Sequence, residues 1–256
     1  MIITSFLYMK NILLITGASR GIGAATARLA VQQNYDICIN YRSNAEAASA
    51  VLQDVVEAGG SGWLMCADVA NEAQVMALYQ SVDERGGSLT GLVNNAGILF
   101  TQAPLLEMSG ERINQVLMTN VTGSLVCARE AVRRMSTKNG GKGGSIVNVS
   151  SAASRLGSPN EFIDYASSKG AIDSFTLGLS KEVGGEGIRV NAVRPGLIET
   201  DIHAASGEPG RVDRLKVGVP MQRGGSAEEV AESIVWLLSE QSSYVNGAFL
   251  DVTGGR

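Results

Sequence analysis

The stretch that decides the fold runs from Asn11 to Gly23 and reads NILLITGASRGIG. Its apolar first half predicts a short buried strand, and residues 21–33 carry the apolar spacing of a helix. The glycines between the two allow the backbone to turn tightly and to approach a ligand closely. The N–H groups at the start of such a helix bind pyrophosphate well. The spacing G-x-x-x-G-x-G therefore predicts a dinucleotide-binding turn, although it differs from the G-x-G-x-x-G fingerprint.

Strand and helix patterns alternate along the rest of the chain. Further strands are expected at 36–40, 62–67, 91–94, 144–149, 188–193 and 248–252, and further helices at 45–58, 72–84, 109–135, 165–183 and 227–239. This order predicts a parallel sheet with helices on both faces. No linker or shift in composition divides the chain, so we expect one domain over residues 1–256. The predicted class is α/β, with a Rossmann-like, doubly wound sheet of seven parallel strands.

Composition and charge exclude several classes of protein. Of the 256 residues, 45% are hydrophobic and 18% are charged, so the chain has material for a large core and is not expected to be disordered. The net charge of −4 and the absence of a basic tract exclude binding to nucleic acid through phosphate neutralisation. The cysteines, Cys38, Cys66 and Cys127, lie far apart, and His203 is the only histidine. We therefore expect buried thiols in a reducing cytoplasm rather than a metal site or disulfides.

The N-terminus carries no targeting signal that we can identify. Residues 1–9 are apolar, but they lack the positive region and the cleavage site of a signal peptide. Met9 precedes Lys10 and could itself be the natural start, which would make the first residues an extension without a role in the fold. No apolar run is long enough to span a membrane.

Several short motifs follow one another in a particular order. The turn TGASRGIG begins at Thr16 and is followed by Asp68-Val69, by Asn94-Asn95-Ala96-Gly97, by Tyr165-x-x-x-Lys169 and by Arg194-Pro195-Gly196. In this order the motifs resemble those of the short-chain dehydrogenase/reductase family, from about Lys10 to Gly255. Within that family, Asn40–Asn44 and Val149–Ser154 are similar to bacterial glucose and sugar-alcohol dehydrogenases and 3-oxoacyl-ACP reductases. The resemblance implies an NAD(P)-dependent oxidoreductase acting on a small carbonyl or secondary alcohol substrate.

The end of the second strand bears on the choice of cofactor. It reads Asn40-Tyr41-Arg42-Ser43-Asn44 and lacks the carboxylate that binds the 2′-OH of NAD. The planar guanidinium of Arg42 matches a 2′-phosphate, and Arg20 can add a second positive charge. We therefore predict NADP, with NAD as the alternative. The cofactor contacts that the resemblance implies are Gly17, Ser19, Arg20, Gly21, Ile22, Gly23, Arg42, Ser43, Asp68, Val69, Asn95, Ala96, Gly97, Tyr165, Lys169, Pro195, Gly196, Ile198 and Thr200.

The chemistry is expected at Tyr165 and Lys169. Their spacing of four places them on one face of a helix. Free tyrosine has a pKa of about 10, and a nearby ammonium lowers the pKa because it favours the phenolate. By resemblance, Tyr165 exchanges the hydroxyl proton, and Lys169 lowers the pKa of Tyr165 and binds the nicotinamide ribose. Hydride transfer is the chemistry of the cofactor, so no metal is expected.

Two further residues complete the set that the resemblance implies. Ser151 hydrogen-bonds the substrate oxygen, and Asn120 positions a water that links Lys169 to solvent. The register around Ser151 leaves Ser150 or Ala152 as alternatives, with Ser154 as a weaker one. A non-catalytic dinucleotide-binding redox sensor or scaffold on the same fold would be expected to lose members of this set. An enoyl reductase would be expected to have a longer spacing from tyrosine to lysine.

The resemblance also bears on the substrate lid and the assembly. Residues 197–219 are expected to form a lid, with His203 partly exposed on it. The cations Arg211, Arg214 and Lys216 either form a solvated helical face, which we favour, or meet an acidic substrate. A homotetramer is expected, with helices around 109–135 and 165–183 pairing across one axis and the last strand and helix across another.

Overall fold

Seven strands form a single sheet in this computed structural model, which describes residues 10–200 and 207–256. The order is β3-β2-β1-β4-β5-β6-β7, and every neighbouring pair is parallel. The strands are β1 (Asn11–Ile15), β2 (Tyr35–Tyr41), β3 (Ser61–Cys66), β4 (Ser88–Asn94), β5 (Gly144–Val149), β6 (Ile188–Pro195) and β7 (Phe249–Val252). The predicted fold class is confirmed. The order reverses at β1, between β2 and β4, and open α/β sheets bind ligands at such a point.

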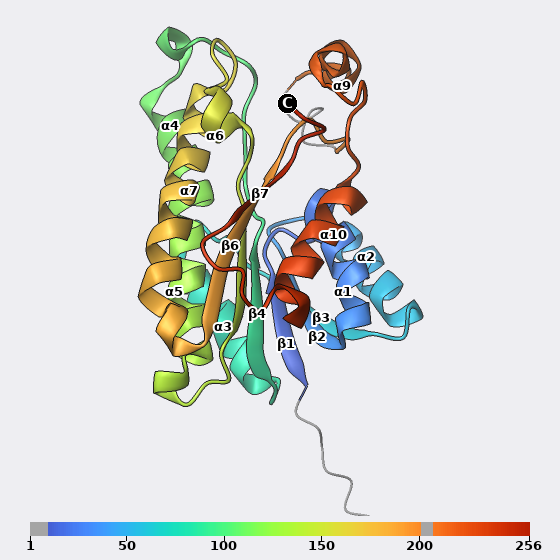
Figure 1. The fold of residues 1–256 in the computed structure, drawn as a ribbon, viewed down its shortest axis with the longest axis vertical. Coiled ribbons are helices and arrows are strands. Elements are labelled where there is room, and N and C mark those ends of the chain that lie inside the picture. Colours follow the sequence, from blue (N-terminus) through green and yellow to red (C-terminus); the bar gives the residue numbers. More distant parts are fainter. Residues whose placement is uncertain (1–9, 201–206) are drawn as a thin grey trace, which may run out of the picture.

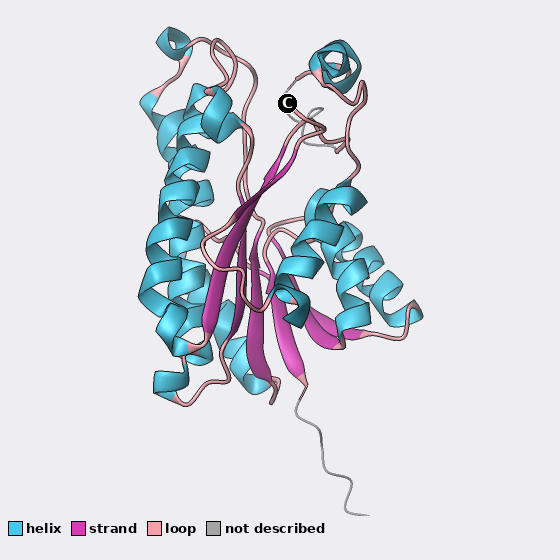
Figure 2. Ribbon diagram, viewed as in Figure 1, coloured by secondary structure: helices cyan, strands magenta, loops and turns pink. Residues whose placement is uncertain are grey.

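Helices cover both faces of the sheet (Figures 1 and 2). One layer holds α1 (Gly21–Ala30), α2 (Ala45–Glu57) and α10 (Ala227–Leu238), and the other holds α3 (Glu72–Glu84), α4 (Gly110–Leu117), α5 (Gly123–Met135) and α7 (Ile163–Val183). Strand β1 packs against both helical layers, because its side chains alternate between the two faces of the sheet. Leu13 and Ile15 belong to the core beneath the first layer, and Ile12 and Leu14 belong to the core beneath the second.

Shorter elements connect these layers. The helices α6 (Ala153–Leu156) and α9 (Arg211–Leu215) lie near the carboxyl ends of the strands, at the top of Figure 1. Short 3-10 turns are η1 (Val31–Gln33), η2 (Leu105–Glu107), η4 (Thr137–Asn139), η5 (Gly184–Glu186), η6 (Lys216–Gly218) and η7 (Glu240–Ser242). Of the helices described between residues 10 and 256, none is both long and apolar enough to cross a membrane.

The long helix expected over 109–135 is wrong as a single element. A π-helical turn, η3 (Met118–Thr122), separates α4 from α5. The widened turn contains Asn120, whose side chain hydrogen-bonds the backbone of Ile98 outside the helix. Apolar periodicity carries no signal for such a turn, since it continues through the bulge.

The cysteines are all free, and one of them differs from expectation. Cys38 and Cys127 are buried, as predicted, but Cys66 is exposed. Cys66 ends β3, the edge strand of the sheet, and its Sγ lies 3.3 Å from the carbonyl oxygen of Arg42. The expected extension, residues 1–9, and His203 lie outside the described residues.

Candidate active site

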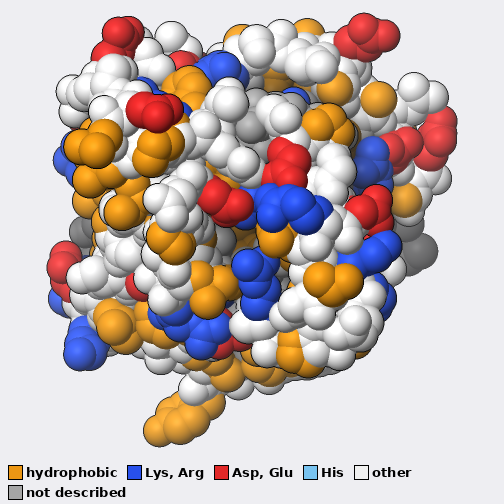
Figure 3. All heavy atoms as spheres, turned by 90° about the horizontal axis from the view of Figure 1, so that it is seen from above, with side chains coloured by type: hydrophobic (Ala, Val, Ile, Leu, Met, Phe, Trp, Pro, Cys, Tyr) orange, Lys and Arg blue, Asp and Glu red, His pale blue; other side chains and the backbone are white. Residues whose placement is uncertain are grey.

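A cavity of about 810 Å³ opens at the carboxyl ends of the strands, around the point where the strand order reverses. Figure 3 looks onto this end of the molecule and shows positive and negative side chains side by side near its middle. All of the cofactor residues expected from the sequence line this cavity except Gly23. Gly17 and Pro195, which lie 178 positions apart in the sequence, therefore meet at one site.

The glycine turn leaves the start of α1 open toward the cavity. Gly17 has a φ of +62°, and a Cβ there would lie 2.9 Å from the Cα of Ala96, so only glycine fits. Arg20 occupies the position before α1, and its side chain does not cap the helix. The first N–H groups of α1 are therefore available to an anion, and the helix dipole favours negative charge there. These features fit the pyrophosphate of a dinucleotide.

Two asparagines hold this turn in place. The Asn95 amide donates to the carbonyl oxygens of Thr16 at 2.9 Å and Gly17 at 3.0 Å. The Asn40 side chain accepts from the Gly17 N–H at 3.2 Å and donates to the Ala67 carbonyl at 3.0 Å. Asn40 was not singled out from the sequence as a site residue.

Gly23 packs against Asn95, whereas the sequence predicted that it contacts the cofactor. It does not line the cavity, and a Cβ there would lie 2.5 Å from Nδ2 of Asn95. Its lack of a side chain makes room for the asparagine that fastens the turn. Gly23 is therefore a packing glycine behind the turn rather than part of the cavity wall.

Two arginines without a carboxylate partner among the described residues lie at the adenosine end of the cavity. Arg20 and Arg42 are exposed and line the cavity, together with Ser43, Asp68 and Val69. Within the described part of the chain, neither guanidinium is paired with a carboxylate. The Asp68 carboxylate instead accepts from the backbone N–H of Ala70 at 2.9 Å.

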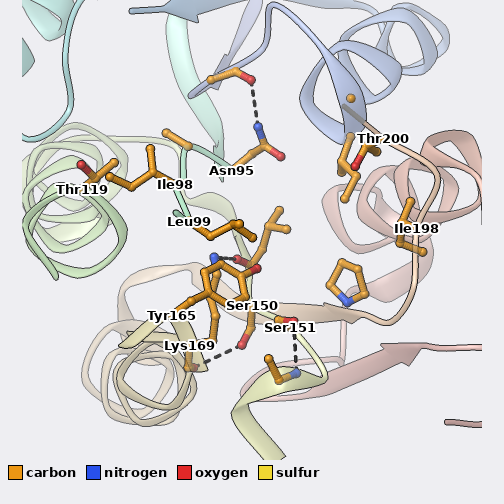
Figure 4. A pocket seen from close by; sticks show the side chains of 18 of the residues that line it. Asn95, Ile98, Leu99, Thr119, Ser150, Ser151, Tyr165, Lys169, Ile198 and Thr200 are labelled. Atoms are coloured by element: carbon orange, nitrogen blue, oxygen red, sulfur yellow. Dashed lines mark hydrogen bonds between the residues drawn. The ribbon is translucent and has the colours of Figure 1, made fainter. Parts of the chain in front are cut away.

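Tyr165 and Lys169 project from α7 into the other end of the cavity (Figure 4). The Lys169 ammonium donates to the Val149 carbonyl oxygen at 2.7 Å and lies 5.4 Å from the centre of the Tyr165 ring. Lys169 is 4% exposed, and this burial lowers its pKa to about 8, while the Asp173 carboxylate acts in the opposite direction.

The expected lowering of the pKa of Tyr165 is not found in the protein alone. Burial raises the pKa of this hydroxyl, and hydrogen bonding with Ser151 opposes the rise without cancelling it. Removing the phenolate from water costs more than the neighbouring groups return. The Lys169 ammonium is held by the Val149 carbonyl rather than by the phenol oxygen.

The structure separates Ser151 from its neighbours. The Ser151 hydroxyl accepts from the Ala153 N–H at 3.1 Å and is the neighbour that opposes the rise in the pKa of Tyr165. The Ser150 hydroxyl instead donates to the Asp173 carboxylate at 2.6 Å and is buried. The Ser154 hydroxyl donates to the Ser151 carbonyl at 2.9 Å. Ser151 therefore has the hydroxyl that meets the tyrosine (Figure 4).

Asn120 lies behind the cavity wall rather than in it. Its side-chain oxygen accepts from the Ile98 N–H at 2.8 Å, and its amide donates to the Ile98 carbonyl and to the Ser168 hydroxyl, both at 3.0 Å. Both amide hydrogens are thus engaged. Asn120 joins the loop after β4 to α7, and its expected part in holding a water beside Lys169 stays a prediction.

One of the three lid cations, Arg211, is not part of the solvated face that we expected. Arg211 is 8% exposed, donates to both oxygens of Glu161 at 2.9 and 2.6 Å, and stacks on Phe162 at 5.0 Å. The exposed Arg214 pairs with Glu208, and the half-buried Lys216 pairs with Asp213. The expectation was wrong for Arg211 because its partner lies 50 residues away in the sequence.

Some lining residues gave no signal in the sequence. Glu161, Phe162, Leu156 and the C-terminal Arg256 all line the cavity. Each of them reaches it through tertiary packing, and none belongs to a motif. The described parts of the expected lid contribute Leu197, Ile198, Thr200 and Arg211 to the wall.

A dinucleotide-sized cavity at the strand-order reversal, with a tyrosine, a buried lysine and a serine at one end, is the arrangement of a nicotinamide-dependent oxidoreductase. Comparisons with known proteins agree. Residues 17–256 match a family model described as "Enoyl-(Acyl carrier protein) reductase". The chain belongs to the short-chain dehydrogenase/reductase family, whose members bind nicotinamide dinucleotides.

Relatives cover nearly the whole chain. It is 58% identical to the uncharacterized oxidoreductase YgfF of Escherichia coli (strain K12), over 96% of this chain and 99% of the relative. It is 37% identical to glucose 1-dehydrogenase 2 of Bacillus subtilis (strain 168), over 94% and 93%. A solved short-chain dehydrogenase/reductase from Serratia marcescens BCRC 10948 has a TM-score of 0.88 at 31% identity, over 96% of this chain and 97% of that one.

Proposed function

We propose that this enzyme transfers a hydride between NADP(H) and a carbonyl or secondary alcohol, with Tyr165 as the general acid and base. The observation that carries the proposal is the meeting of Tyr165, Ser151 and Lys169 in the cavity that also contains the open glycine turn. The bound nicotinamide supplies or accepts the hydride.

The side chains have distinct parts in this proposal. The Tyr165 hydroxyl gives a proton to the substrate oxygen in reduction and removes one in oxidation. The Ser151 hydroxyl hydrogen-bonds the same oxygen. The Lys169 ammonium, held by the Val149 carbonyl at 2.7 Å, stabilises negative charge on Tyr165 and binds the ribose. Asn120 keeps α7 and the loop after β4 together.

The preference for NADP is supported by the charges at the adenosine end. Arg20 and Arg42 line the cavity, and neither is neutralised by a carboxylate in the described part of the chain. A 2′-phosphate bound there would gain charge-assisted hydrogen bonds, whereas a 2′-OH would leave the guanidinium groups unused.

The residues that line the substrate end of the cavity favour an uncharged substrate. Two charged residues of this wall, Glu161 and Arg211, pair with each other, and the Arg211 guanidinium holds the pKa of the Glu161 carboxyl below its usual range. The rest of the described wall there is mainly apolar, with Leu99, Ala152, Leu156, Pro159 and Phe162. An acidic substrate that bound to Arg211 would need to break the Glu161–Arg211 pair, which costs free energy.

We also propose a homotetramer in the cytoplasm. Leu117, Leu125 and Leu177, on the helices expected at one axis, are exposed, as is Trp236 on α10 at the other. Exposed apolar side chains of this size favour burial against a second copy. Free thiols fit a reducing compartment. Light scattering tests the assembly: only the 26.8 kDa chain at high concentration would contradict it.

The activity is tested with NADPH and NADH oxidation across aldehydes, ketones, sugars and oxoacyl thioesters. We expect faster oxidation of NADPH, with uncharged carbonyls as the best substrates, and loss of this activity in Tyr165→Phe. A chain that binds NADPH tightly but turns over no member of the panel would favour the alternative, a redox sensor or scaffold.

A further inference from the structure

Asp173 lies on α7 one turn beyond Lys169 and does not line the cavity. Its side chain is 14% exposed. One carboxylate oxygen accepts from the Ser150 hydroxyl at 2.6 Å, and the other accepts from Nε and Nη2 of Arg194 at 3.0 and 2.9 Å. A carboxylate so enclosed and so fully bonded indicates a fixed geometry.

These bonds join the three elements that carry the proposed active-site groups. Helix α7 carries Tyr165 and Lys169, and Ser150 directly precedes Ser151 at the end of β5. Arg194 directly precedes Pro195 and Gly196, which line the cavity at the end of β6. One side chain thus sets the position of α7 relative to the ends of β5 and β6.

The charges around Asp173 form a short chain leading away from the cavity. Lys169 lies on the same helix, and Arg194 faces Asp173 from β6. On its other side, Arg194 lies 3.8 Å from Asp251 of β7 and stacks on the Phe249 ring at 3.9 Å. Asp251 also pairs with Arg155 of α6 at 3.2 Å. Asp173 is the charged group that acts on Lys169 in the direction of the ammonium form.

We propose that Asp173 is a positioning residue of this reaction, which fixes Ser151 and Lys169 relative to each other through its bonds to Ser150 and Arg194. This inference rests on the proposed function, since it assigns Lys169 a part in turnover. The dependence on charge distinguishes it from a purely structural role. Removing the negative charge releases the proton of Lys169 at lower pH, and removing the positive charge of Arg194 has the opposite effect.

The test compares the pH profiles of turnover in Asp173→Asn, Arg194→Gln and the wild type. Asparagine keeps the size of the side chain and its hydrogen bond with Ser150. We expect the alkaline limb of the profile to move down by about half a pH unit to one unit in Asp173→Asn, and up in Arg194→Gln. Asp251→Asn is the matched control, because Asp251 contacts Arg194 but not Ser150, and its limb is expected to stay in place.

The proposal would be overturned if the alkaline limb of the pH profile stays in place in Asp173→Asn. It would also be overturned if the limb moves in the same direction in Asp173→Asn, Arg194→Gln and Asp251→Asn. If Asp173→Asn does not fold, Arg194→Gln alone tests the proposal: an upward shift of its alkaline limb supports the proposal, and an unchanged limb refutes it.

A second measurement does not need activity. Between pH 7 and 9, the free energy of unfolding of Asp173→Asn is expected to rise more steeply with pH than that of the wild type, since its folded Lys169 is already neutral over more of this range while the unfolded chain keeps the proton. Equal slopes would refute the coupling of Asp173 to Lys169. A wild type without turnover but with the expected difference in slope would refute the proposed function alone.

Discussion

Replacing Lys169 with methionine is expected to stabilise the fold at neutral pH while it abolishes turnover. The two side chains have similar length and are both unbranched, so methionine fills the same space. The ammonium is the expensive part of Lys169, because it is buried and donates to one carbonyl oxygen, that of Val149.

The magnitude follows from the pKa. Burial lowers the pKa of Lys169 from 10.5 to about 8, which corresponds to a cost of about 3 kcal/mol for burying the charged form at pH 7. Methionine removes this cost but leaves the Val149 carbonyl without its lysine partner, at a cost of about 1–3 kcal/mol. The net expectation is a gain of about 1 kcal/mol in the free energy of unfolding at pH 7.

The pH dependence gives the sharper test. The folded protein loses the Lys169 proton near pH 8, whereas the unfolded chain keeps it until about 10.5. Between these values the unfolded state binds more protons, so the stability of the wild type rises with pH. Methionine has no proton to lose. Its advantage is therefore expected to shrink by about 2–3 kcal/mol between pH 8 and pH 10 and to become a disadvantage.

Urea unfolding at pH 7, 8, 9 and 10, followed by tryptophan fluorescence, measures this difference. The contributions of the other titrating groups to the free energy of unfolding cancel when the variant is compared with the wild type at the same pH. Lys181→Met is the matched control, because Lys181 lies on the same helix but is exposed, and its effect is expected to be independent of pH. A Lys169→Met variant that loses the same stability at every pH would refute the reasoning.

Three further predictions concern the cavity. Tyr165→Phe keeps the ring, so NADPH binding followed by fluorescence is expected to survive while turnover falls by about two to four orders of magnitude; turnover near the wild-type rate would contradict the proposed mechanism. Arg42→Ala is expected to weaken the binding of NADPH by about 1–3 kcal/mol and to leave the binding of NADH nearly unchanged. An equal loss of affinity for both cofactors would count against the NADP assignment. Asn95→Ala removes the amide that fastens the glycine turn, so both dissociation constants should rise together, and a loss confined to NADPH would show that Asn95 acts on the 2′-phosphate instead.

The sequence was informative where a short stretch determines its own conformation. The glycine turn was predictable because a positive φ and the approach of Ala96 require glycine at position 17. Tyr165 and Lys169 were predictable as a pair because helical spacing alone puts them on one face. The parallel sheet followed from the alternation of apolar strands with helices, since central strands such as β1 and β5 are buried from both sides.

The sequence was misleading where a side chain depends on a distant partner. Asn120 interrupts a helix because it bonds to Ile98, and Arg211 is buried because Glu161 neutralises it. Neither partner lies close in the chain, so local pattern gave a continuous helix in one case and a solvated arginine in the other. The pKa of Tyr165 also depends on burial, which spacing does not report.

The pairing of arginines gives the two ends of the cavity different chemistry. Arg20 and Arg42 line the adenosine end without a carboxylate partner in the described chain, and Arg211 lines the substrate end fully paired with Glu161. Unpaired guanidinium groups attract a phosphate and are costly beside an apolar ligand, whereas a closed ion pair presents little net charge. Under the proposed function, a ligand with an anionic end and an uncharged end is therefore expected to bind in one orientation. In that orientation its uncharged, reacting end faces Tyr165 and Ser151, which is where a proton can be exchanged.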